Sequence, residues 1–369
     1  MMKVFRTISR ILIGIVFIFS GFVKGIDPLG TGYRLEDYFQ VFGMPWAVPF
    51  ALYLSIFLCT LEFIIGISLL FNLWIRGSAW ALLGMMIFFT CLTFFDAVFN
   101  LVPDCGCFGD AIKLTNTQTF LKNVVFWIFV IPVFTGRNMF KNWAPLSAQK
   151  IFLLVIALFF AGTSVYCYRH LPLIDFMGWK VGSKVNKPSK PLKFFVTYQN
   201  KMTGEEKEYL TPDYPWNDSV WMSQWTFKSQ RSEDPEKDKG LTLRIEDEHG
   251  ADITASIVNN PDFQFIMVAY DLSTTDTEAF RRMLPFYKNA LSDGYSFVCL
   301  TSSLQGEIRR FRMENGAGFD FYSADDAVLK TMVRSNPGLI LIRDGIVLAK
   351  WPFRNFPSFR EVMEEFRKP

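Results

Sequence analysis

The sequence predicts an α-helical membrane bundle followed by a soluble α/β domain, and three observations support this. Five apolar runs in the first half are each long enough to cross a bilayer. Charge density then rises: residues 1–167 hold 11 Lys/Arg and 7 Asp/Glu of the totals of 38 and 35, which leaves 27 and 28 for residues 168–369. From Leu241 onward, short strand-like runs alternate with amphipathic helical runs.

The apolar runs predict transmembrane helices of about 20 residues each. They span residues 4–23, 48–71, 77–99, 119–135 and 151–167. The first run follows basic residues and so resembles a signal peptide, but the stretch from Ser20 to Lys24 lacks an Ala-X-Ala cleavage pattern. We therefore expect a retained helix, with four helices forming the core of the bundle and a fifth added to it.

Basic residues in the short loops indicate the orientation, because cytoplasmic loops are enriched in Lys and Arg. With the N-terminus in the cytoplasm, the inner side carries Lys3, Arg6, Arg10, Arg76, Arg137, Lys141 and Lys150, and the outer side carries Lys24, Arg34, Lys113 and Lys122. The sequence thus predicts a multi-pass protein of the bacterial inner membrane with a periplasmic C-terminal domain. Membrane lipid is then an expected partner. The charge forms no basic stripe and accompanies no nucleic-acid motif, so we expect no nucleic-acid partner.

Cys105 and Cys107 flank Gly106 between the third and fourth apolar runs, on the predicted outer face. Gly106 frees the backbone to fold back, as the small ring of a Cys-X-Cys disulfide requires. Strained, accessible disulfides are often the reducible ones, which favours redox chemistry at this pair. Two alternatives stay open: a static disulfide that braces a turn, and a soft-metal site completed by a partner.

Two acids lie within apolar runs: Glu62 near the middle of the second and Asp96 near the outer end of the third. Because an acid in the bilayer core is costly, each should face the bundle interior and pair or stay protonated. Asp96, only nine residues before Cys105, is the candidate for proton handling. Helix-to-helix hydrogen bonds are the alternative role for both. Lys24 is expected to snorkel to the outer interface.

The remaining cysteines are expected to be structural. Cys59 and Cys91 lie inside apolar runs, Cys167 ends the fifth run, and Cys299 lies within a predicted strand. The aromatic stretch from Tyr33 to Trp46 is predicted as a loop on the outer membrane surface. It is either an interfacial anchor only, or a lid or pocket mouth over the cysteine pair.

Residues 1–140 resemble the DoxX-like membrane proteins, and more closely the methylamine-utilisation MauE type. The resemblance rests on Ser20-Gly21, Lys24 and Asp27-Pro28 at the end of the first run, on Glu62 and Gly66, and most specifically on Cys105-Gly106-Cys107-Phe108-Gly109. It implies a four-helix bundle related to vitamin K epoxide reductase, with a role in making or passing disulfides. In that picture electrons move from protein thiols through Cys105 and Cys107 to a membrane quinone. The fifth helix and the large external domain depart from the basic pattern.

The soluble half is predicted to begin with a connection rich in Lys and Pro over residues 185–191, followed by a small β-rich subdomain and a polar, mobile loop over 229–240. Strands are then expected at residues 241–246, 265–272, 295–302, 318–322, 338–342 and 347–351, and helices at 275–291, 305–312, 324–333 and 357–366. This part looks like a thioredoxin fold, with Pro337 at the position of that family's cis-proline. The stretch from Asp271 to Asp276 holds no Cys-X-X-Cys, so this domain cannot exchange disulfides in the usual way.

We therefore expect four regions: a DoxX/MauE-like four-helix membrane domain (1–140), a fifth transmembrane helix (141–170), a linker with a small β-rich subdomain (171–240), and a thioredoxin-like domain without the dithiol (241–369). The predicted function is thiol-disulfide redox at Cys105 and Cys107, with Asp96 as a third site residue, a possible quinone cofactor and a protein-thiol substrate or partner. The rival function is a non-enzymatic scaffold with a structural bridge and a partner-binding soluble domain. With His170 and His249 as the only histidines, no zinc cluster is predicted.

Overall fold

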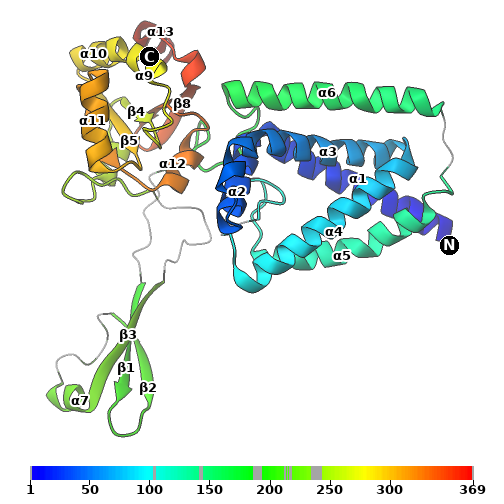
Figure 1. The fold of residues 1–369 in the computed structure, drawn as a ribbon. Coiled ribbons are helices and arrows are strands. Elements are labelled where there is room, and N and C mark those ends of the chain that lie inside the picture. Colours follow the sequence, from blue (N-terminus) through cyan, green and yellow to red (C-terminus); the bar gives the residue numbers. More distant parts are fainter. Residues whose placement is uncertain are drawn as a thin grey trace. The chain divides into compact units, whose positions relative to one another are not determined.

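The fold is that of a computed structural model, which describes residues 2–102, 105–140, 144–185, 193–211, 213, 215, 218–233 and 243–367, without the side chains of 193–195 and 229–233. The chain divides into two compact units (Figure 1). The first comprises Met1–Lys180, Val333–Leu339 and Trp351–Pro369, and the second comprises Val181–Met332 and Ile340–Lys350.

Five long helices dominate the first unit, and each is long and apolar enough to cross a membrane. They are α1 (Met2–Ile26), α3 (Ala51–Phe71), α4 (Ile75–Phe99), α5 (Asn116–Gly136) and α6 (Leu146–His170). The five apolar runs are thus confirmed as helices. Four of them extend a few residues beyond their predicted bounds, whereas α3 begins three residues after the predicted start of the second run. The chain is a multi-pass membrane protein.

Helices α1 and α3 approach each other closely because glycines lie at the contact, with Gly14 of α1 against Gly66 of α3. A Cβ built on Gly21 would lie 2.6 Å from the backbone nitrogen of Phe63, and one on Gly66 would lie 2.5 Å from that of Ile18. No real side chain fits at such distances. Small residues that let backbones touch are the usual means by which transmembrane helices associate in lipid. The contact also places Lys24 of α1 against Glu62 of α3.

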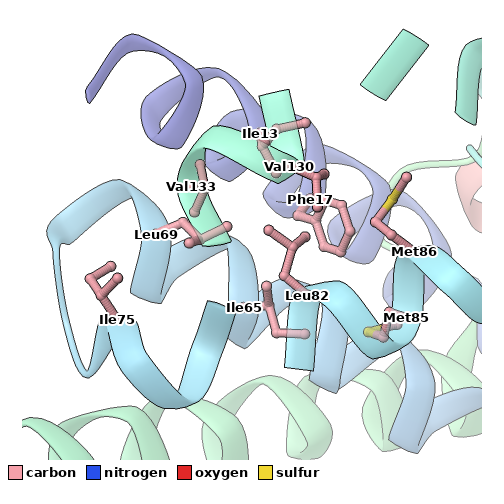
Figure 2. Close-up of a cluster of buried hydrophobic side chains, with 10 residues drawn as sticks. All are labelled: Ile13, Phe17, Ile65, Leu69, Ile75, Leu82, Met85, Met86, Val130 and Val133. Carbon is pink, nitrogen blue, oxygen red and sulfur yellow. The ribbon is translucent and has the colours of Figure 1, made fainter. Parts of the chain in front are cut away.

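The core of the bundle is a cluster of buried side chains from α1, α3, α4 and α5, which point toward one another in Figure 2. Its members are Ile13, Phe17, Ile65, Leu69, Ile75, Leu82, Met85, Met86, Val130 and Val133. By contrast, most of α6 is exposed, with Phe159 at 76%. Four helices therefore form the packed bundle and α6 lies at its margin, in agreement with the predicted four-plus-one arrangement.

The aromatic segment after α1 is not the loop that the sequence predicted. It forms helix α2 (Pro28–Val41) and the 3₁₀ helix η1 (Pro45–Phe50). Asp27 caps α2 by accepting a hydrogen bond of 3.1 Å from Gly30 N, and Pro28 occupies the first helical position, where its missing N–H is harmless. The capping aspartate and the proline thus begin a helix, although Gly30 and Gly32 made this segment look like a loop in the sequence.

The second unit begins with a small antiparallel sheet of order β2-β1-β3, formed by β1 (Lys193–Asn200), β2 (Glu206–Leu210) and β3 (Trp225–Glu233), with α7 (Ser219–Gln224) before β3. The predicted β-rich subdomain is therefore present. Its core is aromatic: Tyr198, Trp221 and Trp225 pack together. The predicted mobile loop at 229–240 was wrong for 229–233, which continue β3 in register with β1. Residues 234–240, and most of the predicted Lys/Pro connection, lie outside the described residues.

A five-stranded sheet follows, of order β6-β5-β4-β7-β8. The strands are β4 (Gln264–Val268), β5 (Ser296–Thr301), β6 (Asp320–Ser323), β7 (Gly338–Arg343) and β8 (Ile346–Pro352), and β5 runs parallel to both β4 and β6. The predicted strand at 241–246 is absent among its described residues, where Glu246 makes two isolated bridges, to Asp252 and Ser323. Helices α8 (Thr254–Val258), α9 (Thr277–Arg282), α10 (Leu284–Ser292), α11 (Gln305–Asn315), α12 (Asp326–Met332) and α13 (Phe359–Phe366), with the 3₁₀ helix η3 (Phe353–Asn355), complete the chain.

The soluble part has the α/β fold that the sequence predicted. The Asn336–Pro337 peptide bond is cis and directly precedes β7, at the position where the resemblance to a thioredoxin fold placed a cis-proline. The segment after β4 contains no cysteine, and Cys299 is fully buried within β5. Cys299 therefore contributes packing, and the two thiols that lie close together, Cys105 and Cys107, belong to the membrane part.

Candidate active site

The Cys-Gly-Cys segment lies between α4 and α5, and both of its ends are fixed by side chains. Helix α4 ends at Asn100, whose backbone is left-handed (φ 48°). Asn116 Nδ2 donates a 2.9 Å hydrogen bond back to the carbonyl oxygen of Val102. Thr115 and Gln118 form a reciprocal capping box that begins α5. The loop is therefore held by α5 at both ends, although residues 103 and 104 lie outside the described residues.

Cys105 and Cys107 are both free thiols, and their sulfur atoms lie 3.6 Å apart. Both line a cavity of about 380 Å³ whose wall is mostly apolar. Phe17, Leu58, Phe89, Leu92 and Phe126 contribute to that wall, and so does α2, through Tyr38 and Phe39. The aromatic segment therefore forms part of a pocket around the cysteine pair, which was one of the two roles the sequence left open.

Gly106 is required between the two cysteines for two reasons. Its backbone is left-handed (φ 64°), which side chains rarely tolerate. Any Cβ would also collide with the side chain of Arg34, which lies directly over Gly106. Arg34 is anchored there by a 3.1 Å ion pair to Asp110, three residues after Cys107. An arginine from α2 thus covers the turn that brings the sulfurs together.

Asp110 connects this arginine to a second one. Arg334, in the Val333–Leu339 segment of the first unit, lies 2.8 Å from Asp110 and 2.9 Å from Asp27, the residue that caps α2. Burial alone would raise the pKa of Asp110, but Arg34 and Arg334 outweigh it and hold that pKa below its ordinary value. The four groups form a largely buried charge cluster that ties the loop after Cys107 to the start of α2.

Cys107 faces a buried ion pair. Lys24 Nζ lies 2.5 Å from Glu62 Oε1, and Ser20 Oγ lies 2.9 Å from Glu62 Oε2 and 2.8 Å from the backbone oxygen of Cys107. Lys24 is only 8% exposed, so the prediction that it snorkels to the outer interface was wrong. A carboxylate in reach of the ammonium group offered a better partner than the interface. Glu62 faces the interior and pairs, as expected of an acid in the bilayer.

Cys105 faces a different pair of groups. The Tyr38 hydroxyl of α2 donates a hydrogen bond to Asp96 Oδ2 of α4 and is also in hydrogen-bonding contact with the Cys105 thiol. Asp96 is fully buried. The structure thus brings all three predicted site residues into one site, with Asp96 connected to Cys105 through Tyr38. Neither Tyr38 nor the Lys24–Glu62 pair stood out in the sequence as part of this site.

The other cysteines differ in their relation to the cavity. Cys59 lines it, one helical turn before Glu62 on α3. Residues three apart lie on the same face of a helix, so this spacing in the sequence could have indicated that Cys59 faces the site together with Glu62. Cys167 is buried. Cys91 is exposed on the outer surface of α4, away from the cavity lining.

The two thiols have opposite acidities. The hydrogen bond that Cys105 donates, helped by Lys122 and Lys24, outweighs burial and lowers the pKa of Cys107 to about 6 from its ordinary 9.0. The same hydrogen bond, together with burial, raises the pKa of Cys105. Near neutral pH the pair therefore holds one proton, on Cys105.

This difference predicts the pH dependence of Cys107 alkylation. Because only the thiolate reacts, labelling of Cys107 by a bimane reagent should rise through a midpoint near pH 6. Lys122→Gln removes a nearby positive charge and should move the midpoint upward, toward 9.0. Peptide mass spectrometry of the labelled protein separates Cys107 from Cys105. Lys113→Gln, the same change at an exposed position, should leave the midpoint in place. A wild-type midpoint near 9.0 would contradict this assignment.

The structure defines a class of protein: a multi-pass membrane protein with a dithiol in an apolar cavity and a soluble α/β region. Residues 2–136 match the family model described as methylamine utilisation protein MauE, which confirms the MauE part of the resemblance seen in the sequence. The solution structure of a putative protein disulfide isomerase from Bacteroides thetaiotaomicron is similar over 34% of this chain and 82% of its own, with 12% identity and a TM-score of 0.27. A likeness that distant carries no argument about function. A search of curated proteins returned no match.

Proposed function

We propose that this protein is a membrane thiol-disulfide oxidoreductase in which Cys105 and Cys107 cycle between dithiol and disulfide. The observation that carries the proposal is the placement of two free thiols, 3.6 Å apart, in the wall of one apolar cavity. A disulfide needs a sulfur separation of about 2.05 Å, which a small movement of the Gly106 turn supplies. The lowered pKa of Cys107 supports the assignment, because the thiolate is the reactive form.

The cavity supports a quinone-class electron acceptor as the oxidant. Its volume of about 380 Å³ falls within the ordinary range of small-molecule sites, and its wall is apolar apart from a few polar groups such as Ser20, Lys122 and Asn123. A flat apolar ring with two carbonyl oxygens matches that combination. The dithiol loses two electrons and its remaining proton as the S–S bond forms. The acceptor gains the two electrons, that proton and a second proton from solvent, and becomes a hydroquinone.

The disulfide so formed is proposed to oxidise protein thiols outside the membrane. A substrate dithiol attacks the Cys105–Cys107 bond, a mixed disulfide forms, and the second substrate thiol releases the reduced pair. The excess of basic residues in the predicted inner loops supports placing this site on the periplasmic face of a bacterial inner membrane. The soluble region, whose one cysteine is buried, would bind or present the thiol protein rather than exchange disulfides itself.

The test is the reduction potential of the pair in nanodiscs, measured by thiol trapping against a glutathione series. We expect a value near or above about −200 mV, in the range of exchange-competent disulfides. The reduced protein should also convert menadione to its hydroquinone, with one disulfide formed per acceptor reduced. A potential below about −300 mV, or thiols that never oxidise, would leave the rival scaffold function.

A further inference from the structure

A buried polar chain runs from Cys105 away from the cavity. The Tyr38 hydroxyl contacts the Cys105 thiol and donates to Asp96 Oδ2. Tyr38 is 6% exposed and Asp96 is fully buried. The second carboxylate oxygen, Asp96 Oδ1, is buried and has no hydrogen-bond partner among the residues that the structure describes. A buried carboxylate oxygen without a donor is costly in a folded protein and needs an explanation.

The redox function proposed above gives that oxygen a role, because Cys105 must lose a proton whenever the disulfide closes. We propose that Tyr38 is a catalytic residue that passes the proton of the Cys105 thiol to Asp96 as the Cys105–Cys107 bond forms. Asp96 then holds the proton as a carboxylic acid. Tyr38 touches the reacting sulfur, and Asp96 acts through Tyr38.

The step balances in atoms and electrons. Before it, Cys105 is a thiol, Cys107 a thiolate and Asp96 a carboxylate. The S–S bond forms, the Cys105 S–H bond breaks, and the proton moves to the Tyr38 oxygen as the Tyr38 hydroxyl proton moves to Asp96. Two electrons leave the sulfur pair for the quinone-class acceptor. That acceptor takes two protons: Asp96 returns one, and solvent supplies the other.

The groups near Cys105 can accept its proton, whereas those near Cys107 cannot. In the resting pair the Cys105 proton is donated to Cys107, so it must turn to another acceptor when the sulfurs bond. The Lys24–Glu62 pair lies on the Cys107 side and is already mutually satisfied. Burial, then the contact with Cys105, raises the pKa of Tyr38, so it stays a phenol and relays a proton rather than storing a charge.

The test is the rate at which the reduced pair oxidises in Tyr38→Phe, which keeps the buried ring and removes only the hydroxyl. We expect oxidation to slow by on the order of 10²-fold. Asp96→Asn should slow it similarly. The double variant should be no slower than the slower single variant, because the two residues act in one step. Tyr53→Phe, the same change at a 71% exposed position on α3, is the matched control and should keep the wild-type rate.

Each rate is measured with menadione and with oxidised glutathione, because closing the disulfide releases the same proton with either oxidant. Slow oxidation of Tyr38→Phe by glutathione supports the relay even if the wild type fails to reduce menadione, which would overturn only the proposed acceptor. A Tyr38→Phe protein that oxidises at the wild-type rate with both oxidants overturns the relay. So do additive losses in the double variant, since two separate structural defects would combine. Unfolding curves confirm that the variants are folded.

Discussion

Serine at either Cys105 or Cys107 is expected to abolish thiol oxidation, with a loss of at least about 10³-fold, because a single thiol cannot close the intramolecular disulfide. The two variants should nevertheless differ in what they trap. In Cys105→Ser the remaining Cys107 thiolate stays near Lys24 and Lys122, and the serine hydroxyl can still donate to it. It should therefore form a mixed disulfide with glutathione at neutral pH. In Cys107→Ser, Cys105 remains a protonated thiol and should trap little glutathione.

Mass spectrometry of the intact variants after exposure to oxidised glutathione measures this asymmetry. Cys91→Ser is the matched control, since Cys91 faces outward from the bundle and should be dispensable for oxidation. The reverse pattern, with glutathione accumulating on Cys105 rather than Cys107, would overturn the assignment of Cys107 as the reactive thiolate. Full activity in either serine variant would exclude the pair as the redox centre.

Glu62→Gln is expected to destabilise the bundle strongly. The Lys24 ammonium would lose its ion-pair partner at 2.5 Å while staying buried, and breaking a buried pair from one side costs about 3–5 kcal/mol. The midpoint of thermal unfolding in detergent, followed by tryptophan fluorescence, measures the effect. The double variant Lys24→Met/Glu62→Gln removes both charges and should recover most of the lost stability, because a neutral pair needs no compensation.

The surface ion pair of Arg360 and Glu364 supplies the control for this experiment. Both side chains are largely exposed, so Glu364→Gln should leave the unfolding midpoint unchanged. If Glu62→Gln were as stable as the wild type, Lys24 would have to be solvated or neutral in the folded protein. A double variant less stable than either single variant would show that packing, rather than charge, dominates at this position.

The membrane part could be predicted from sequence because each helix needs an apolar run of fixed length, and five such runs are present. Helix α2 was missed since aromatic residues and two glycines outweighed its start signals, Asp27 and Pro28. In the soluble part, the predicted helix at 275–291 is divided into α9 and α10 at Met283, two residues before Pro285. Proline cannot continue a helix hydrogen-bond ladder, so the break follows a rule that periodicity alone ignores.

The candidate site was predictable only where its chemistry is local. Cys105, Gly106 and Cys107 are adjacent in sequence, and Asp96 is near them along the chain. Tyr38 and Lys24 reach the sulfurs from α2 and α1, far away in sequence, so only tertiary packing reveals them. Lys24 shows the difficulty most clearly, because its position near a helix end fits an interfacial lysine as well as a buried one.

The unequal surroundings of Cys105 and Cys107 bear on how such a centre could be engineered. A Cys-Gly-Cys tripeptide is nearly symmetric along the chain, so the motif itself does not determine which cysteine is the reactive thiolate. The difference comes from the helices: α1 and α5 place cations near the Cys107 sulfur, and α2 and α4 place a phenol and a carboxyl group near the Cys105 sulfur. If the loop alone were grafted onto another scaffold, the disulfide could form but neither sulfur would be favoured as the reactive thiolate. The difference between the two sulfurs would be retained only if the four helices were transferred as well.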